Sequence, residues 1–357
     1  MTTDQQSTVE RSDSREPATV THEQRRGAIG TRVAYSLTAL RSANTVWILT
    51  ALIAIIIMFS LVRPDSFASP ANARNIALDA ASLLILACGQ TFVMITAGID
   101  LSVGSVLIFA SVVSAKVMLA MGGSNAGLSA IIAGFIVAVA GGLVWGLVNG
   151  AIISFGKVPP LIATLGTLGM ALGCAQLLTN GVDVREVPTV LNDTLGNGTV
   201  AGIPWIVIVA AVVVTIAGLV LSYTRFGRYT FAIGSNIEAS RRSGIDVRAH
   251  LLKVYALTGA LGGLAGFLNV ARFATTTIAG HTTDNLNAIA GVVIGGTSPF
   301  GGVGTIVGTV IGVFIPAVLQ NGFVVSGVQP FWQTVAVGVV LIVAVYFDIK
   351  RRARTSK

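Results

Sequence analysis

The most restrictive feature of this sequence is a series of long segments with few charges, each close to the length that crosses a membrane. A helix needs about 20 apolar residues to span a bilayer. The segments that qualify are 45–62, 77–97, 101–121, 128–154, 160–179, 204–222, 251–271, 303–321 and 330–347. Because the hydrocarbon interior cannot hydrogen-bond an exposed backbone, each segment is predicted to be a helix.

The composition supports the same conclusion. The chain is 53% hydrophobic and only 11% charged, whereas soluble domains carry roughly 25% charged residues. This excludes a soluble enzyme, a disordered chain and a coiled coil. Glycine is abundant, at 41 of 357 residues, without the three-residue period of collagen. Small residues let membrane helices approach closely, so the chain is predicted to be an all-α polytopic membrane protein.

A further apolar run is too short to span upright. It covers 286–297 and ends in the sequence Gly295-Gly296-Thr297-Ser298-Pro299-Phe300-Gly301-Gly302. We interpret it as a half-span or re-entrant element, which is tolerated where protein or a cavity shields its backbone. Counting it gives about ten transmembrane helices, including one short or broken span.

Basic residues orient the chain, because cytoplasmic loops are enriched in Lys and Arg. They cluster before the first span, in the loop 223–250 and at the C-terminus. We expect a disordered cytoplasmic tail at 1–44, a transmembrane domain at 45–348 and a basic cytoplasmic tail at 349–357. Six spans before the loop and four after it place all three basic clusters on one side. The net charge of +8 therefore indicates membrane orientation and no nucleic-acid partner.

Glycines spaced by four form two ladders, Gly142-Gly146-Gly150 and Gly304-Gly308-Gly312. This spacing puts each set on one helix face. We expect both ladders to be sites of close helix packing.

Catalytic motifs are missing from the sequence. The nearest approach to a phosphate-binding loop runs from Gly150 to Gly156-Lys157, with one residue too many and Val158 where Ser or Thr would hold magnesium. The two cysteines and three histidines form no metal motif, and no hydrolase motif occurs. The chain is therefore predicted not to be an enzyme and to need no cofactor or metal. The chain is not expected to bind ATP by that route.

Charges within the apolar segments are few. Asp79 lies early in its span and Asp100 directly precedes the next one. Asp100 can cap the following helix, but intramembrane charges are functional candidates by default. A stand-alone ion-coupled carrier that uses Asp79 or Asp100 is therefore an alternative. A membrane scaffold is another, although polar residues within apolar spans (Gln90, Asn149 and Thr164) argue weakly against it.

The cytoplasmic loop contains a short helix with its own start and stop signals. Asn236 is a good N-cap, Glu238 lies in the first turn, Arg241 and Arg242 lie in the last turn, and Gly244 ends the helix. Two turns are too short for a stable isolated helix. We expect it to dock on a partner or to lie at the lipid headgroups.

An ordered set of motifs carries a family resemblance over roughly residues 45–350. The motifs are Gly89-Gln90-Thr91, Ala97-Gly98-Ile99-Asp100-Leu101-Ser102-Val103-Gly104-Ser105-Val106, Asn149-Gly150, Lys157-Val158-Pro159-Pro160, Ile162-Ala163-Thr164-Leu165-Gly166, Thr224-Arg225-Phe226-Gly227-Arg228, Ala232-Ile233-Gly234-Ser235-Asn236, Ser243-Gly244-Ile245, Ala288-Ile289-Ala290, Gly295-Gly296-Thr297-Ser298 and Gly301-Gly302-Val303-Gly304-Thr305. The set resembles the ribose-type sugar permeases of ATP-binding-cassette (ABC) importers, which are inner-membrane components that depend on a binding protein.

The resemblance implies a permease in the bacterial cytoplasmic membrane, usually a homodimer, with two structurally related halves. Its partners would be a cytoplasmic ABC ATPase and an extracytoplasmic sugar-binding protein. The substrate would be a monosaccharide such as a ribose-like pentose, a hexose or a related polyol, with branched-chain amino acids as an alternative. The implied ATPase coupling helix contains Asn236, Glu238, Ala239, Arg241, Arg242 and Gly244. The candidate substrate pathway contains Gln90, Asp100, Ser102, Asn149, Thr164, Asn287 and Thr297.

One segment departs from the family pattern. Where the family usually has Tyr-Glu-Leu-Asp, this chain has Asp284-Asn285-Leu286-Asn287. Two carboxylates are thus replaced by amides. We expect a less acidic external face at this place, which would affect binding-protein docking or a gate.

Overall fold

The computed structural model describes residues 43–281, 283–329 and isolated positions between 332 and 346. Nearly all of the predicted tail at 1–44, the tail at 349–357 and much of the last predicted span lie outside the described residues.

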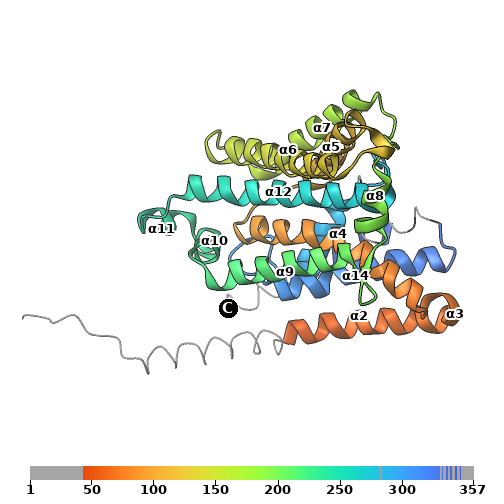
Figure 1. Cartoon of the computed structure of the whole chain (residues 1–357). Helices are drawn as coiled ribbons and strands as arrows, with labels where there is room; N and C mark the ends of the chain where they lie inside the picture. The colour runs from red at the N-terminus through yellow and green to blue at the C-terminus, as the bar shows by residue number, and fades with distance from the viewer. Residues whose placement is uncertain are drawn as a thin grey trace, which may run out of the picture. The chain divides into compact units, whose positions relative to one another are not determined.

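The described part of the chain is a bundle of helices (Figure 1). In chain order its elements are α2 (Ala43–Val62), α3 (Pro64–Phe67), α4 (Pro70–Ile95), α5 (Val103–Ala120), η1 (Gly123–Asn125), α6 (Leu128–Ser154), α7 (Pro160–Thr179), α8 (Thr189–Leu191), η2 (Asn192–Gly196), β1 (Thr199–Val200), β2 (Ile203–Pro204), α9 (Trp205–Tyr223), α10 (Arg225–Ser235), α11 (Ile237–Arg242), α12 (Val247–Phe273), α13 (Asp284–Ile294) and α14 (Ile306–Val325). The strands β1 and β2 form a small antiparallel hairpin in the loop before α9.

The helices follow the predicted spans closely. Seven described helices are long and apolar enough to cross a membrane, and α2 and α13 contain shorter apolar stretches. The bounds of α6 and α7 equal the predicted ones. Helix α4 begins at Pro70 rather than at residue 77, because Ser69 caps it and accepts a hydrogen bond from the Asn72 amide. The structure is thus a polytopic helical membrane protein, and the total of ten crossings stays a prediction.

Helix α4 lies at the centre of the bundle. In its most apolar stretch 94% of the residues are buried, against 22% in the corresponding stretches of α6 and α9. It contacts α12, α9, α14 and α13. A helix that is apolar all round belongs in the interior of a bundle. Helices α6 and α9, by contrast, present much of their surface to lipid or to a partner.

Glycines bring the backbones of several helices together. A Cβ on Gly142 or Gly146 of α6 would collide with the backbone of α12, at the Gly259 and Tyr255 carbonyls respectively. In the same way Gly308 and Gly312 of α14 leave no room for a Cβ against α13. The predicted packing role of these glycines is therefore confirmed.

Two helices begin part-way through the bundle. The start of α5 lies beside the middle of α12. A Cβ placed on Gly262 of α12 would lie 3.3 Å from the Val106 side chain of α5. A Cβ on Gly104, at the start of α5, would lie 2.9 Å from the His281 carbonyl oxygen and 3.4 Å from the Asn285 amide nitrogen at the start of α13. The N-termini of α5 and α13 therefore meet about half-way along α12. Helix N-termini carry partial positive charge.

Candidate functional site

The first helix break connects α4 to α5. Ala97 adopts a left-handed backbone conformation with φ of 62°, which is uncommon for a residue with a side chain. Asp100 is 2% exposed. Its carboxylate Oδ1 accepts hydrogen bonds from the Ser102 amide, at 2.8 Å, and from the Ser102 hydroxyl, at 2.6 Å. Asp100 thus holds Ser102, the residue directly before α5. It does not bond the first amides of the helix, where no side-chain cap is present, so the predicted capping role was wrong.

A polar network continues from this break into neighbouring helices. The Asn149 side-chain amide of α6 donates to Ser102 Oγ at 2.8 Å. The Thr167 hydroxyl of α7 donates to Asn149 Oδ1 at 2.6 Å. The network therefore links the break to α6 and α7.

Two more side chains hold the backbone of the break itself. Thr164 of α7 donates its hydroxyl to the Ile99 carbonyl at 3.2 Å. The side-chain amide of Gln90 on α4, oriented so that its donors face acceptors, makes two hydrogen bonds with the backbone of Asp100. Its nitrogen donates to the Asp100 carbonyl and its oxygen accepts from the Asp100 N–H, both at 3.2 Å. Together with Asn149 of α6, these residues let three helices, α4, α6 and α7, fix one short stretch of irregular backbone. Such shielding is how irregular backbone is tolerated within a membrane.

The structure brings together five of the seven predicted pathway residues, namely Gln90, Asp100, Ser102, Asn149 and Thr164. Sequence reasoning missed Thr167. It lies three residues after Thr164, on the same face of α7, and this spacing could have indicated it. The other two predicted residues lie elsewhere. Asn287 is on α13 and Thr297 is in the second break.

The polar side chains of the network are buried, and most of their hydrogen bonds are to other members of the network or to the backbone of the break. Gln90, Thr164 and Ser102 have no exposed surface. In this conformation these side chains therefore hold the helix break in place, and they do not form the wall of an open channel. Buried polar networks of this kind rigidify a structure when their members are satisfied.

The second break connects α13 to α14 and is built mostly of backbone. Gly301 and Gly302 have φ of 84° and 75°, a conformation that glycine adopts without steric cost. The Gly302 amide donates to the carbonyl of Ile95 at the end of α4, at 2.9 Å. The two breaks are thus joined directly. Thr297 lines the second break, and its hydroxyl has no hydrogen-bond partner among the described residues.

Helix α10 lies against both breaks. A Cβ on Gly234 would collide with the Ile95 carbonyl and would come within 2.7 Å of the Gly302 amide nitrogen. The Thr230 hydroxyl also lies 2.9 Å from His250 Nε2, which ties α10 to the first turn of α12. Helix α10 continues into α11 through Asn236, so a single residue separates α11 from the helix that contacts both breaks.

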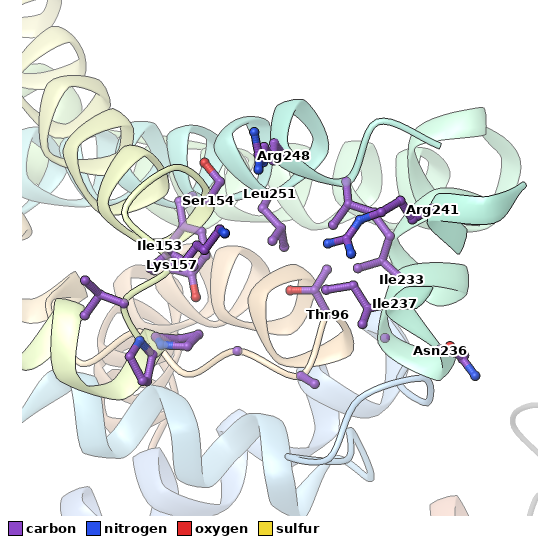
Figure 2. Close-up of a pocket in the computed structure, with 18 of the residues that line it drawn as sticks. Thr96, Ile153, Ser154, Lys157, Ile233, Asn236, Ile237, Arg241, Arg248 and Leu251 are labelled. Atoms are coloured by element: carbon purple, nitrogen blue, oxygen red, sulfur yellow. The ribbon is translucent and has the colours of Figure 1, made fainter. Parts of the chain in front are cut away.

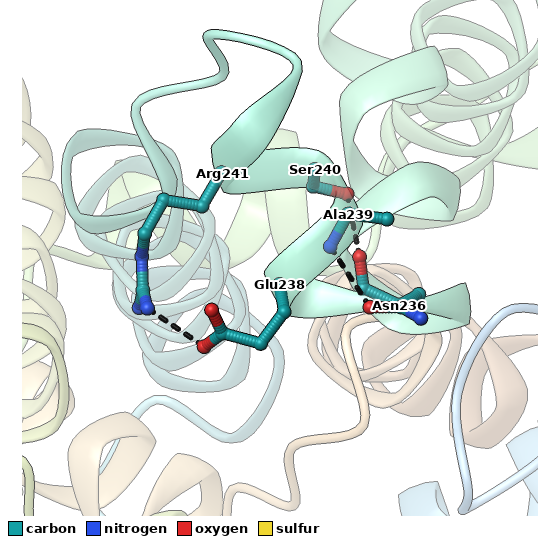
Figure 3. Close-up of polar contacts among 5 residues, drawn as sticks. All are labelled: Asn236, Glu238, Ala239, Ser240 and Arg241. Carbon is teal, nitrogen blue, oxygen red and sulfur yellow. Dashed lines mark hydrogen bonds and ion pairs between the residues drawn. The ribbon is translucent and has the colours of Figure 1, made fainter.

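The short helix predicted at 236–245 is present as α11 (Figure 3). Asn236 Oδ1 accepts from the Ala239 amide at 2.9 Å, so the predicted N-cap is confirmed. Glu238 and Arg241 form an ion pair at 2.7 Å, with side chains that are 62% and 58% exposed. Arg242 and Ala239 are exposed too, and Gly244 has φ of 82°. Most of this helix is therefore open to a partner.

In the segment that departs from the family pattern, the two asparagines are buried, whereas Leu286 is 40% exposed. Asn285 and Asn287 are only 6% and 9% exposed, so the expectation that they form part of an external docking face was wrong. The Asn285 side-chain amide donates to the Leu101 carbonyl at 3.0 Å. A carboxylate cannot make this bond. The amide therefore links α13 to the first break.

Asp79, the other carboxylate considered for ion coupling, forms an ion pair with Arg272 of α12 at 2.7 Å. The pair joins the first half of α4 to the end of α12. In this structure the ion pair therefore holds α4 against α12.

A cavity of about 480 Å³ opens beside α11 (Figure 2). Its wall combines the start of the first break at Thr96–Gly98, the end of α6 with the loop to α7, the junction of α10 with α11, and the first turns of α12. The described residues contain no group of acidic, cysteine or histidine side chains that could hold a metal ion.

These features define a class: a multi-pass membrane protein with interrupted helices whose ends meet about half-way along α12, and interrupted helices are typical of transporters. Comparison with known proteins is consistent with that class. Residues 72–345 match the family described as "Branched-chain amino acid transport system / permease component", and the chain belongs to this family.

Individual relatives are sugar permeases by name. The chain is 38% identical to the ribose import permease protein RbsC of Escherichia coli K12 over 307 residues, which is 85% of this chain and 93% of that protein. It is 39% identical to RbsC of Bacillus subtilis over 84% of this chain and 91% of that protein. It is 34% identical to the galactose/methyl galactoside import permease protein MglC of E. coli K12, over 89% and 97% of the two chains. No solved structure matches the chain significantly. The predicted resemblance to sugar permeases is confirmed.

Proposed function

We propose that this chain is the transmembrane permease subunit of an ATP-driven importer, and that it moves a monosaccharide across the bacterial inner membrane. An extracytoplasmic binding protein would deliver the sugar, and a separate cytoplasmic ABC ATPase would hydrolyse ATP. The observation that carries the proposal is the connection from exposed α11 through α10 to both helix breaks. The names of the relatives support the substrate class.

The proposed coupling runs through α10. Closure of the ATPase would displace α11, whose exposed side chains Glu238, Arg241 and Arg242 would contact a groove of that subunit. Gly234 would pass the displacement to the Ile95 carbonyl and the Gly302 amide, because no side chain separates them. Both breaks would then shift together between outward- and inward-facing arrangements. Packed interfaces switch between discrete states rather than deforming continuously.

The orientation and span count belong to the same proposal. With ten crossings and α11 in the cytoplasm, both termini are cytoplasmic. Arg225, Arg228, Arg241 and Arg242 around α10 and α11 support this placement.

A second copy of the chain would complete the pathway. On α7, a Cβ placed on Gly166, Gly169 or Gly173 would meet no atom of another element within 4 Å. Their face of α7 is therefore smooth and uncovered within one chain. Small residues on such a face allow close approach of another helix, which supports a homodimer with α7 near the partner.

The coupling proposal is tested in proteoliposomes that contain the permease, its ATPase and its binding protein. The double variant Arg241→Glu with Arg242→Glu should abolish sugar-stimulated ATP hydrolysis and uptake, because both charges on the exposed end of α11 are reversed. Lys253→Glu reverses an exposed charge on α12 and serves as the matched control. ATP-dependent uptake that survives the double change would count against coupling through α11.

An ion-coupled carrier is the second candidate. Its two carboxylates are already engaged, Asp79 with Arg272 and Asp100 with Ser102, which does not favour it. Uptake by the purified chain alone, driven by a proton or sodium gradient, would overturn the ATP-driven proposal. Competition of labelled-sugar uptake by leucine or valine would point instead to the amino-acid substrates in the family description.

A further inference from the structure

The cavity beside α11 has the size of a small-molecule site. Its volume of about 480 Å³ falls within the roughly 300–1,000 Å³ of typical ligand pockets. Apolar side chains make part of its wall, including Ile153, Ile233, Val247 and Leu251. Thr96, Ser154, Ser235 and Asn236 add hydroxyl and amide groups to this lining. A ligand with both polar and apolar surface would fit it.

Positive charge surrounds this cavity. Lys157, Arg241 and Arg248 line it, and none of its lining residues is acidic. Figure 2 shows Lys157 and Arg241 on opposite sides of the space. Glu238 neutralises part of this charge through its ion pair with Arg241, but it does not line the cavity. A concave space lined by one sign of charge raises the local concentration of the opposite ion.

A buried hydroxyl also lines the cavity without a partner. Tyr255 of α12 has no exposed surface, and its hydroxyl has no hydrogen-bond partner among the described residues. This hydroxyl lies 2.6 Å from where a Cβ of Gly98, another lining residue, would be placed. Leaving a buried hydroxyl unpaired costs free energy. Because this hydroxyl is fully enclosed, a ligand in the cavity would reach it only if the wall around Gly98 moved.

The backbone of the cavity wall is unusual at two places. Ala97 and Lys157 both line it, and both adopt positive φ, at 62° and 55°. Such conformations in residues with side chains cluster at active sites and ligand clamps. The conformation of Lys157 places a cation in the short loop between α6 and α7, on the wall opposite Arg241.

We propose that this cavity binds a phosphate group carried on a small hydroxylated body. Lys157 and Arg248 would hold the phosphate oxygens through charge-assisted hydrogen bonds, and Arg241 would add positive charge on the facing wall. Two sources offer this chemistry, a soluble sugar phosphate and the glycerophosphate headgroup of an anionic lipid. This site is additional to the sugar pathway, and binding to it does not require transport.

The experiment uses the full-length permease without its ATPase or binding protein, so that a failure of the transport proposal does not affect it. In one arm, ribose 5-phosphate, glucose 6-phosphate and inorganic phosphate are titrated into detergent-solubilised protein by isothermal titration calorimetry. In the other arm, thermal unfolding is compared in nanodiscs of phosphatidylglycerol and phosphatidylcholine. Saturable binding in the first arm identifies a soluble phosphate. A higher melting temperature in phosphatidylglycerol identifies the lipid headgroup.

The variants localise the effect to the cavity. Lys157→Gln and Arg248→Gln should each weaken binding by about tenfold, because each removes a charge-assisted hydrogen bond. Lys253→Gln removes an exposed charge of α12 outside the cavity lining and should leave binding unchanged.

Two results would overturn the proposal. One is the absence of both saturable phosphate binding and lipid-dependent stabilisation. The other is a loss that is equal in Lys157→Gln and Lys253→Gln, since this would indicate a general effect of surface charge. Lys157 and Arg248 are exposed, so these variants are expected to fold, which size-exclusion chromatography would verify.

Discussion

The two helix breaks perform the same structural task by opposite means. The break between α4 and α5 is held by side chains, through Asp100, Ser102 and Asn149. The break between α13 and α14 is held largely by glycine backbone, with Gly302 bonded to Ile95 and with Gly295 packed against Gly308. One break therefore depends on hydrogen-bonding groups, and the other depends on the absence of side chains.

This difference predicts different sensitivities. The first break should fail when a polar group loses its partner, whereas the second should fail when any atom is added. The polar network buries its hydrogen bonds in a region of low dielectric, where they are strong but costly to leave unpaired. The glycine contacts leave no space for even a methyl group.

The largest effect is expected from Gly308→Ala, at the contact that closes the glycine-built break. Its Cβ would collide with the carbonyl of Gly295 at the end of α13, which is backbone and cannot rotate away. We expect a loss of about 3 kcal/mol, the upper end for overpacking. The thermal or denaturant-induced unfolding of the purified protein in detergent measures it. Gly218→Ala in α9, where only Ile306 approaches and no closer than 3.9 Å, is the control. Equal stability of the two variants would refute the difference between the breaks.

The next effect is expected from Asn149→Leu in the polar network. It removes the donor to Ser102 and the acceptor of Thr167. Leaving these buried groups unpaired should cost about 2 kcal/mol. If the residues act as a network, combining this change with Thr167→Val should cost less than the sum of the two single variants. Strict additivity in the same unfolding assay would mean that the hydrogen bonds are independent.

Asn285→Asp tests the link between α13 and the first break. The carboxylate would place an acceptor opposite the Leu101 carbonyl, where the amide now donates. We expect a loss of about 1.5 kcal/mol, somewhat more than the cost of the lost hydrogen bond alone. Asn285→Ala removes the bond without adding charge, so it should be the milder of the two. If the aspartate variant is as stable as the native protein, the amide is not needed to join α13 to the first break.

The smallest effect is expected at the start of α14. The Thr305 hydroxyl accepts from the Gly308 amide at 3.0 Å and so caps the helix that follows the second break. Thr305→Ala should cost about 1 kcal/mol, the usual cost of a lost N-cap. Thr305→Ser keeps the hydroxyl and should retain most of the stability. A serine variant as unstable as the alanine variant would show that the methyl group, and not the cap, matters here.

Much of the fold could be predicted from the sequence, because membrane helices are set by segment length. Gly and Pro residues flank α6 and α7, and the predicted bounds were those observed. The start of α4 was placed too late because Asn72, Arg74 and Asn75 lower the hydropathy there. A capped helix continues through polar residues, which hydropathy alone does not detect.

The site was predictable only in part. The polar residues of the first break stand out in apolar segments, so Gln90, Asp100 and Asn149 were found. The role of Gly234 could not be found in this way, because its contacts come from residues far along the chain. The burial of Asn285 was missed for a related reason. A segment between two spans was taken as external, whereas the loop before α13 returns into the bundle.

The position of α10 limits how freely this protein could exchange parts with its relatives. A designer who wished to match the permease to a foreign ATPase would be inclined to transplant α11 alone. Because Gly234 touches the ends of both breaks, the transplant would have to include α10 and keep a glycine at that place. The helix proposed to meet the ATPase and the irregular backbone inside the membrane are therefore expected to be inherited as one unit.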